Sequence, residues 1–503
     1  MKTKKLLCVV LTAFIISLIL LAACSPEKQE SGDTNIPANN DGDAESNAQS
    51  PNDADGAAAD AEEKYEFTGH DFKGYAMRVL IPDHDSWAMS TITSEEEDGD
   101  PLNDAIFRRN SLIQEKLNVT IQEICVTGPE SRAKKAIQSN SDDYDVIFTD
   151  CAQAGSIASQ GFYLNLYDVP GLNLEKSYWN QGANNSAELL GKLYFTTSDA
   201  NIITNDGIWV LYFNKKIHQD LGLDSPYQLV RTGKWTIDAL YDMAKASAID
   251  VDGDGKWTAA DLWGISTHGL GFLAFLECQD EKLIKLNEEG EPYLINPSAR
   301  FVNAFVKAHQ IMNKDNGLWL HGEGSFVGKN SDIDHQRKTF MADMSMFCSE
   351  VLGHARAFRE MTADFGLLPH PKFDEYQNNY YTFMIDTIPA FGIPITVPEP
   401  EKSGVFMDAF TAVSAETIIP AYYKISLEGK FTRDEDSIEM LDIIRDGRVF
   451  DLAVLYNWSN FYNAVITYGT GKEGTNPTTI FDKNRGKVEA AIAKTVDAFR
   501  NFD

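Results

Sequence analysis

Basic residues and cysteines are both scarce in this chain of 503 residues. Its 44 Lys and Arg face 75 Asp and Glu, which gives a formal net charge of −31 at pH 7. A chain this acidic repels phosphate backbones and anionic membrane surfaces, so we expect no nucleic-acid partner and no direct membrane contact. Six cysteines are too few for a disulfide scaffold. The length allows roughly two to four domains with sizeable cores.

The sequence also lacks the common enzyme motifs. It contains no His-Glu-x-x-His, no Gly-x-Ser-x-Gly and no Walker sequence. The segment 469–474 matches G-x-G-x-x-G, but Thr-Asn-Pro follows it instead of a helix, so we expect no dinucleotide role. Cys125, Cys151, Cys278 and Cys348 do not have the spacing of a metal site, and we expect buried thiols, with a disulfide as the alternative. Carboxylate pairs for glycoside hydrolysis stay open, because the acidic residues offer many pairs.

The N-terminus has the organisation of an export signal. Lys2, Lys4 and Lys5 precede an uncharged apolar run that ends in Leu-Ala-Ala-Cys24. This ending resembles the lipobox of bacterial lipoproteins, in which the cysteine is lipidated and becomes the new N-terminus. An uncleaved transmembrane anchor is the alternative, since the run is long enough to span a bilayer. We predict a lipoprotein signal peptide over 1–23 and a diacylglycerol anchor on Cys24.

The segment 24–64 has the composition of a disordered tether. After Cys24 it carries eleven acidic residues and two lysines, and it contains no aromatic residue. Such a segment cannot bury enough apolar surface to fold, and its charges make it extend. We therefore expect it to hold a folded body, 65–503, away from the membrane.

Apolar strands and amphipathic helices alternate in this body. We predict strands over 75–82, 119–126 and 145–149 with helices between them, the first helix capped by Asn103. The rhythm indicates an α/β fold with a largely parallel sheet. Ligands bind beyond the carboxyl ends of such strands, which marks 83–87 and 150–153 as a candidate rim. Further strands are predicted over 208–213, 343–351 and 390–397, and further helices over 237–246, 298–312, 333–341, 434–445 and at the end of the chain.

The segment 250–261, DVDGDGKWTAAD, matches the calcium-loop template. It has acidic residues at positions 1, 3 and 5, glycine at position 6 and an acid at position 12. The template prefers Glu at position 12, and the shorter Asp weakens the expected affinity; an Asx-rich turn is the alternative. We predict one structural Ca²⁺ held by Asp250, Asp252, Asp254, the Lys256 carbonyl, Thr258 and Asp261.

Aromatic residues are plentiful, with 28 Phe, 19 Tyr and 8 Trp. Trp209 lies in an apolar run and Trp235 precedes a helix start, so we predict that both belong to the core. Trp87, Trp179 and Trp458 stand among small polar residues in loops, a mixture that suits a sugar site, although packed surface rings are the alternative.

Five groups of segments carry a family resemblance. They are DVIFTD at 145–150, GKLYF at 191–195 with DGIWVLYFNK at 206–215, GKWTID at 233–238 with LWGI at 262–265, DFGLLPHPK at 364–372, and AYYKISLEGK at 421–430 with RDEDS at 433–437 and MLDII at 440–444. Together they resemble the bacterial extracellular solute-binding proteins of family 1, the lipoprotein receptors of ABC sugar importers.

The resemblance implies a two-lobed, periplasmic-binding-protein-like α/β fold of type II. Lobe 1 would comprise 65–205 and 386–415, and lobe 2 would comprise 206–385 and 416–503, with a hinge between them. It also implies a protein that captures a carbohydrate, in particular an oligosaccharide, and delivers it to ABC permease subunits without breaking a bond. We expect a monomer, exported to the extracellular face and anchored only by its lipid. The alternative is an exported carbohydrate-active enzyme, such as a glycoside hydrolase.

The ligand is expected between the lobes. Asp150 and Glu350 end strand-like runs, and Asp199 precedes the inferred crossing between the lobes. A sugar needs an aromatic ring for its C–H face and several fixed acceptors for its hydroxyls. We therefore predict a site of Trp87, Trp179 and Trp458 with Asp150, Asp199 and Glu350 as hydroxyl acceptors.

Overall fold

The computed structural model describes residues 65–84, 88–258, 260–312, 317–321, 335–427, 435–472 and 474–502. The predicted signal peptide, the lipidation site Cys24 and the tether lie outside this part of the chain, as does Trp87. Within the described ranges, none of the helices combines the length and the hydropathy that a bilayer span requires.

The first of two five-stranded sheets has the order β2-β1-β3-β13-β4. Strands β1 and β2 run parallel, as do β1 and β3, whereas β13 is antiparallel to both of its neighbours. The mainly parallel arrangement and the α/β class are as predicted from the alternating pattern. The strands are β1 (Tyr75–Pro82), β2 (Val119–Val126), β3 (Val146–Asp150), β4 (Thr196–Thr197) and β13 (Pro389–Gly392).

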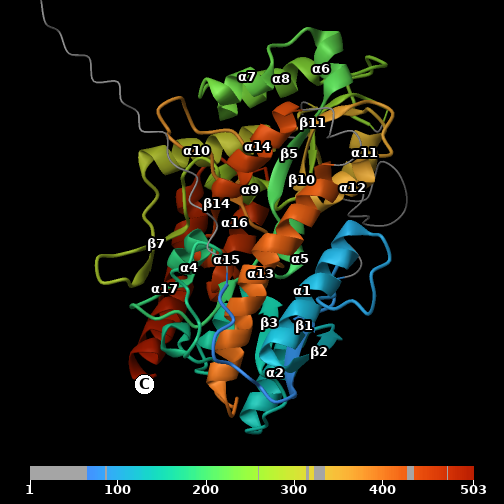
Figure 1. Ribbon diagram of the computed structural model, residues 1–503. Coiled ribbons are helices and arrows are strands. Elements are labelled where there is room, and N and C mark those ends of the chain that lie inside the picture. Colours follow the sequence, from blue (N-terminus) through green and yellow to red (C-terminus); the bar gives the residue numbers. More distant parts are fainter. Residues whose placement is uncertain are drawn as a thin grey trace, which may run out of the picture. The chain divides into compact units, whose positions relative to one another are not determined.

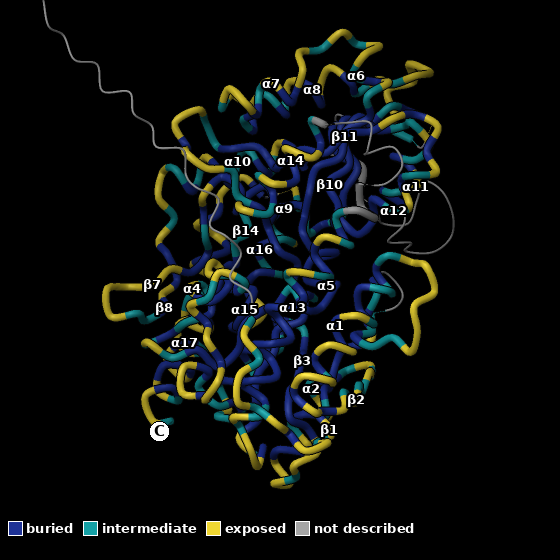
Figure 2. Tube along the Cα trace, viewed as in Figure 1, coloured by how far each residue is buried: buried dark blue, intermediate teal, exposed yellow. Residues whose placement is uncertain are grey.

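The second sheet has the order β11-β5-β10-β6-β9. Strand β10 is parallel to β6 and antiparallel to β5. Both β3 and β10 are buried along nearly their whole length (Figure 2), because helices cover both faces of such sheets and the strands need continuous apolar runs. The strands are β5 (Trp209–Asn214), β6 (Trp263–Thr267), β9 (Trp319–His321), β10 (Ser345–Val351) and β11 (Phe365–Leu368).

Helices surround the two sheets, and two short strand pairs complete the fold. Helix α13 (Pro400–Leu427) packs along α1 (Pro101–Leu117) beside the first sheet (Figure 1). The short pairs are β7 (Ile284–Leu286) with β8 (Pro292–Leu294) and β12 (Thr382–Phe383) with β14 (Arg448–Val449). The other helices used below are α2 (Pro129–Gln138), α3 (Cys151–Ala158), α5 (Ile202–Asp206), α8 (Ile237–Ser247), α9 (Gly271–Glu277), α10 (Ala299–Ile311), α11 (His335–Met341), α12 (Ala355–Phe358), α14 (Glu435–Asp446), α15 (Leu452–Leu455), α16 (Phe461–Gly469) and α17 (Pro477–Asn501).

Two segments carry the chain between the sheets. One runs from β4 through α5 to β5, and the other runs from β11 through β12 to β13. They lie side by side, since Ile208 and Met384 form an antiparallel bridge. The Leu352 amide donates to the Ile208 carbonyl at 2.7 Å, which joins the first crossing to the end of β10.

Several details differ from the prediction. The first helix begins at Pro101 and its cap is Asp100, whose side chain accepts from the amides of Leu102 and Asn103. Proline suits the first helical turn, so the cap moves to the residue before it. The predicted cap at Asn103 is therefore wrong, because that residue lies inside the helix.

Two strands are shorter than predicted. Strand β13 ends at Gly392, two residues before Pro394, which has no amide to donate to a sheet. Strand β10 starts at Ser345 because Asp343, with φ 59°, lies in the left-handed region and ends the preceding turn. Cys125 is exposed, which contradicts its predicted burial, whereas Cys151, Cys278 and Cys348 are buried as expected.

The core assignments of two tryptophans are confirmed, since Trp209 and Trp235 are both buried. The lobe boundaries at 205/206, 385/386 and 415/416 stay a prediction. Helix α13 runs without a break across the last of these positions.

Candidate ligand-binding site

The carboxyl ends of strands from both sheets reach the crossing segments. Asp150, the last residue of β3, pairs in register with Pro389 at the start of β13, directly after the second crossing. Val351, the last residue of β10, pairs with Trp209 directly after the first crossing. Ligands of open α/β sheets bind beyond such strand ends, where the chain changes direction.

A group of polar side chains lies at this position, and we call it the sheet-edge cluster: His84, Asp150, Asp386 and Tyr462. The Nε2 atom of His84, just after β1, lies 2.8 Å from Oδ1 of Asp150. The Tyr462 hydroxyl, on α16, donates to Oδ2 of Asp386 at 2.7 Å. Segments far apart in the sequence thus bring a ring, an imidazole and two carboxylates together.

The first turn of α3 holds Asp386 in place. The Ala152 amide donates to the Asp386 carbonyl at 3.2 Å, and the Cys151 thiol donates to the same carbonyl at 3.2 Å. Burial, together with the nearby Asp386 and Asp150, raises the pKa of the Cys151 thiol well above its usual value, so it stays protonated. Cys151 therefore acts as a hydrogen-bond donor that fixes the second crossing to the first sheet.

Asp386 is a carboxyl whose surroundings raise its pKa. Burial raises its pKa, the hydrogen bond from Tyr462 opposes that shift, and the charge of Asp150 raises the pKa further. His268, which follows β6 of the second sheet, opposes the shift weakly. The site therefore places two carboxylates close enough to repel each other.

Of the five predicted ligand-binding residues that the structure describes, only Asp150 lies in the sheet-edge cluster. His84 falls within the predicted rim at 83–87 but was not singled out. Asp386 and Tyr462 were missed altogether. Tyr462 lies four residues after Trp458, in a segment that the sequence had already singled out. Asp386 carries no local signal, because its position depends on the crossing of the chain.

Trp458 is packed inside the protein. Its side chain stacks on Tyr456 with ring centroids 4.8 Å apart and an interplanar angle of 7°, and its Nε1 donates to Thr495 Oγ1 at 2.9 Å. The residue is 4% exposed. These contacts favour a packing role over the predicted contact with a ligand.

Glu350 is also enclosed by the protein, with 4% exposure. It accepts from the Gln336 side chain at 2.8 Å and from the Val351 amide at 3.0 Å, and His354 Nδ1 lies 3.5 Å away. Burial raises the pKa of Glu350, but the interactions with His354 and Gln336 outweigh burial and hold it below its usual value. Its acceptor capacity is largely used within the second sheet and α11.

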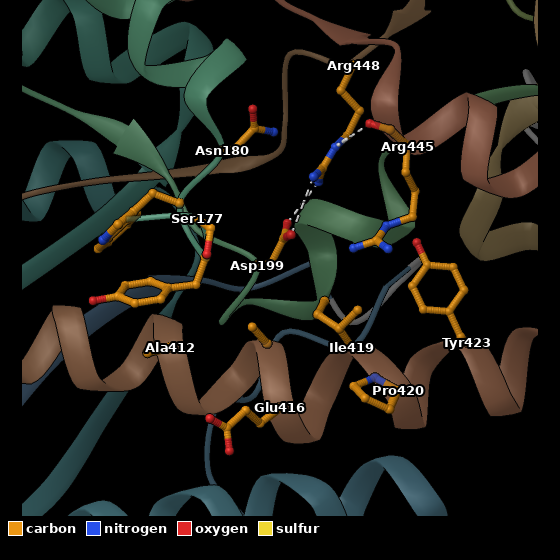
Figure 3. A pocket seen from close by; sticks show the side chains of 13 residues that line it. Ser177, Asn180, Asp199, Ala412, Glu416, Ile419, Pro420, Tyr423, Arg445 and Arg448 are labelled. Atoms are coloured by element: carbon orange, nitrogen blue, oxygen red, sulfur yellow. Dashed lines mark hydrogen bonds and ion pairs between the residues drawn. The ribbon is translucent and has the colours of Figure 1, made fainter. Parts of the chain in front are cut away.

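Trp179 and Asp199 line one cavity of about 300 Å³ between the loop before α4 (Gln181–Ala187), helix α13 and strand β14 (Figure 3). Trp179 is 2% exposed, and its Nε1 donates to Oδ1 of the buried Asp408 at 3.0 Å. Asp199 forms an ion pair with Arg448 at 2.9 Å. The cavity contains no residue of the sheet-edge cluster, so the structure separates these two predicted residues from Asp150.

The predicted calcium loop brings three of its carboxylates together. Ligand atoms of Asp250, Asp252 and Asp254 all lie within 4.8 Å of one another. Asp261 is buried and accepts from the Val251 amide at 2.9 Å and from the Thr258 hydroxyl at 3.0 Å. The first three acids fit a hard cation, whereas the short Asp261 side chain is engaged with the loop itself.

Comparison with known proteins adds evidence on the family. Residues 97–275 match the family model described as bacterial extracellular solute-binding protein. A comparison with curated proteins finds no match.

Solved structures of the same architecture cover most of the chain. UspC of M. tuberculosis has 12% identity and a TM-score of 0.55, with 83% of this chain and 100% of UspC covered. A sugar transporter of Rhizobium etli in an open conformation has 12% identity and a TM-score of 0.53, with 86% and 100% covered. The GacH receptor of Streptomyces glaucescens has 13% identity and a TM-score of 0.51, with 85% and 98% covered.

At such identities the structural likeness shows the fold alone. The family model over 97–275 agrees with this fold. The predicted resemblance is therefore confirmed: residues 97–275 carry the sequence pattern of the bacterial extracellular solute-binding proteins, and the chain has the α/β fold of the solved structures named above.

Proposed function

We propose that the protein captures an oligosaccharide at the sheet-edge cluster and delivers it to the permease of an ABC importer. The observation that carries this proposal is the convergence of strand ends from both sheets on the crossing segments, where polar side chains gather. The GacH receptor has been solved with acarbose, and another structure of this fold, with a TM-score of 0.51, is a cyclo/maltodextrin-binding protein complexed with maltotetraose. Both names support an oligosaccharide ligand.

In this proposal Asp150 and Asp386 accept hydrogen bonds from sugar hydroxyls. Asp150 uses Oδ1 for His84, and no described residue donates to its Oδ2, so an acceptor is ready for a ligand. Tyr462 orients Asp386, and Trp87 remains the proposed stacking ring. We do not extend the proposal to Trp458, Trp179, Asp199 or Glu350, because their contacts within the protein favour structural roles.

We propose that capture is coupled to the crossing segments. Asp386 belongs to the second crossing, so a ligand bound there touches the part of the chain about which two lobes would rotate. A ligand can shift an open–closed equilibrium only by its difference in affinity for the two states. The closed, loaded form would then be the one presented to the permease.

A screen for thermal stabilisation with neutral, basic and acidic oligosaccharides tests the function, followed by calorimetric titration of each sugar that binds. Asp150→Asn and Asp386→Asn should weaken binding while leaving the melting temperature of the free protein nearly unchanged. Asp220→Asn is the matched control, because Asp220 is exposed on a surface helix and pairs with Lys216 on the same helix. Release of reducing ends would instead support a glycoside hydrolase, and no binding to any carbohydrate would contradict the proposal.

We propose that a diacylglycerol group on Cys24 holds the monomeric protein on the outer face of the cell membrane. The support is the Leu-Ala-Ala-Cys ending of the apolar run and the acidic tether that follows it. Intact mass and detergent partitioning of the expressed protein test this, with Cys24→Ala as the unlipidated control. Mature protein that retains residues 1–23 would contradict it.

We propose that the 250–261 loop binds one structural Ca²⁺ through Asp250, Asp252, Asp254, the Lys256 carbonyl, Thr258 and Asp261. A ligand that binds only the folded state stabilises it by about 2.7 kcal/mol at a hundredfold excess over its Kd. EDTA should therefore lower the melting temperature, and Asp252→Ala should abolish that sensitivity. A wild-type melt that ignores EDTA, with no calcium by elemental analysis, would refute the ion.

A further inference from the structure

The two carboxylates of the sheet-edge cluster have little positive charge near them. Asp150 contacts His84, and Asp386 contacts Tyr462. Neither carboxylate forms an ion pair with a lysine or arginine in the described part of the chain. This differs from Asp199 and Asp206, which are paired with Arg448 and Arg356.

Both carboxylates are also only partly covered. Asp150 and Asp386 have intermediate exposure, and the side chain of Asp150 is 28% exposed. A carboxylate that serves only to hold the fold together is normally enclosed by its donors, as Asp408 is by Asn173, Tyr178 and Trp179. Asp150 instead keeps one oxygen without a donor among the described residues, at the edge where this fold binds its ligand.

The charge of Asp150 acts on Asp386, so a ligand group that contacts one carboxylate also meets the field of the other. Asp150 raises the pKa of Asp386, and His268 opposes this shift. Two like charges in a partly desolvated site disfavour each other. A third negative charge brought by a ligand would add to that repulsion, whereas a positive charge would relieve it.

The net charge of the whole protein also favours a positively charged ligand. The formal net charge of −31 gives the protein a negative field that concentrates cations and repels anions before contact, to an extent that salt reduces. Long-range attraction and local acceptors therefore favour the same kind of ligand.

We propose that Asp150 and Asp386 are specificity-determining residues that select an oligosaccharide carrying protonated amines, such as an amino sugar, over neutral and acidic ones. This inference rests on the proposed capture of a sugar at the sheet-edge cluster. The amine donates to both carboxylates, and each hydrogen bond is strengthened by the opposite charges. Because Asp386 belongs to the crossing between the sheets, an amine bound to it also contacts the predicted hinge region.

The test is calorimetric titration of the mature full-length protein with three matched tetrasaccharides. They are tetra-glucosamine, its N-acetylated neutral form and tetra-galacturonate. We expect the amine to bind about tenfold more tightly than the neutral sugar, which corresponds to one charge-assisted contact. The acidic sugar should not bind. Added NaCl should weaken binding of the amine more than binding of the neutral sugar.

Variants separate charge from shape. Asp386→Asn and Asp150→Asn keep the size of each side chain. They should weaken binding of the amine more than binding of the neutral sugar, and so reduce the preference for the amine to about twofold or less. Asp220→Asn should leave the preference intact. Equal or tighter binding of the neutral or acidic sugar would overturn this inference and leave sugar capture standing. If neither the three tetrasaccharides nor any other carbohydrate in the screen binds, sugar capture is overturned and this inference with it.

Discussion

Replacement of Trp458 distinguishes a packing role from a ligand-binding role. The indole is 4% exposed, stacks on Tyr456 at 4.8 Å and donates to Thr495 at 2.9 Å. Truncation of a buried Trp to Ala removes these contacts and leaves a cavity, which costs about 3–5 kcal/mol. The structure thus predicts a large loss of stability from a residue whose sequence context suggests a sugar contact.

The backbone around Trp458 supports the upper part of this range. Asn457, Ser459 and Asn460 all have positive φ, at 46°, 56° and 55°. Non-glycine residues pay for this conformation, and it persists only where surrounding contacts enforce it. The buried indole is the contact that anchors this turn, so its removal should also release the turn.

Two substitutions of Trp458 remove its contacts in graded steps. Trp458→Phe keeps an aromatic face against Tyr456 and loses the hydrogen bond to Thr495, which is worth about 1 kcal/mol. Trp458→Ala should cost several times more. Urea unfolding followed by circular dichroism measures both, and titration with a sugar found by screening measures binding at a temperature where each variant is folded.

One outcome would contradict the packing role of Trp458. If Trp458→Ala unfolds within about 1 kcal/mol of the wild type and yet loses sugar affinity, the indole contacts the ligand and the packing argument fails.

Two further substitutions test buried charges. Glu277 is buried, and no described residue donates to its carboxylate. Burial, followed by the charge of Asp451, raises the pKa of Glu277 well above 4.5. The folded protein therefore holds this proton more tightly than the unfolded chain, and the resulting stabilisation is fully present below pH 4.5 and is lost as the pH rises. Glu277→Gln should thus stabilise the protein increasingly from pH 5 to pH 8 in urea unfolding, and a constant difference between the two proteins would contradict the shift. Asp206 is fully buried, accepts from both terminal nitrogens of Arg356 at 3.0 and 2.8 Å and from Tyr422 at 2.7 Å, so Asp206→Ala should cost about 3–5 kcal/mol. Adding Arg356→Met should restore part of that loss, and full additivity of the two changes would refute the pairing argument.

Much of the architecture could be predicted because the buried strands are apolar runs. The first two strands have the predicted bounds, and Trp209 and Trp235 lie in the core as expected. Errors occurred where one residue decides a boundary: Asp100 before Pro101 at a helix start, and Pro394 after a strand. Cys125 was predicted buried because its neighbours are apolar, but β2 is an edge strand, and one face of an edge strand is open to solvent.

The candidate site was only partly predictable, for a related reason. The position of Asp150 follows from topology, because the end of a parallel strand lies at the ligand edge whatever the loops do. The aromatic assignments depended on composition, and composition does not say which way a ring points. Trp179 and Trp458 stand among small polar residues because those residues form tight turns, and the turns direct the rings inward onto Phe391 and Tyr456.

Asp386 and Tyr462 show what sequence reasoning of this kind lacks. Neither residue belongs to a motif, and the two meet only because the chain crosses between the sheets twice and then returns through α16. The contacts of Cys151 and Ala152 with the Asp386 carbonyl fix that crossing against the end of β3. A residue placed by a crossing can contact the ligand and the hinge region at once. In the proposed capture mechanism, in which the protein closes over its ligand, a single carboxylate at this position would control both affinity and closure.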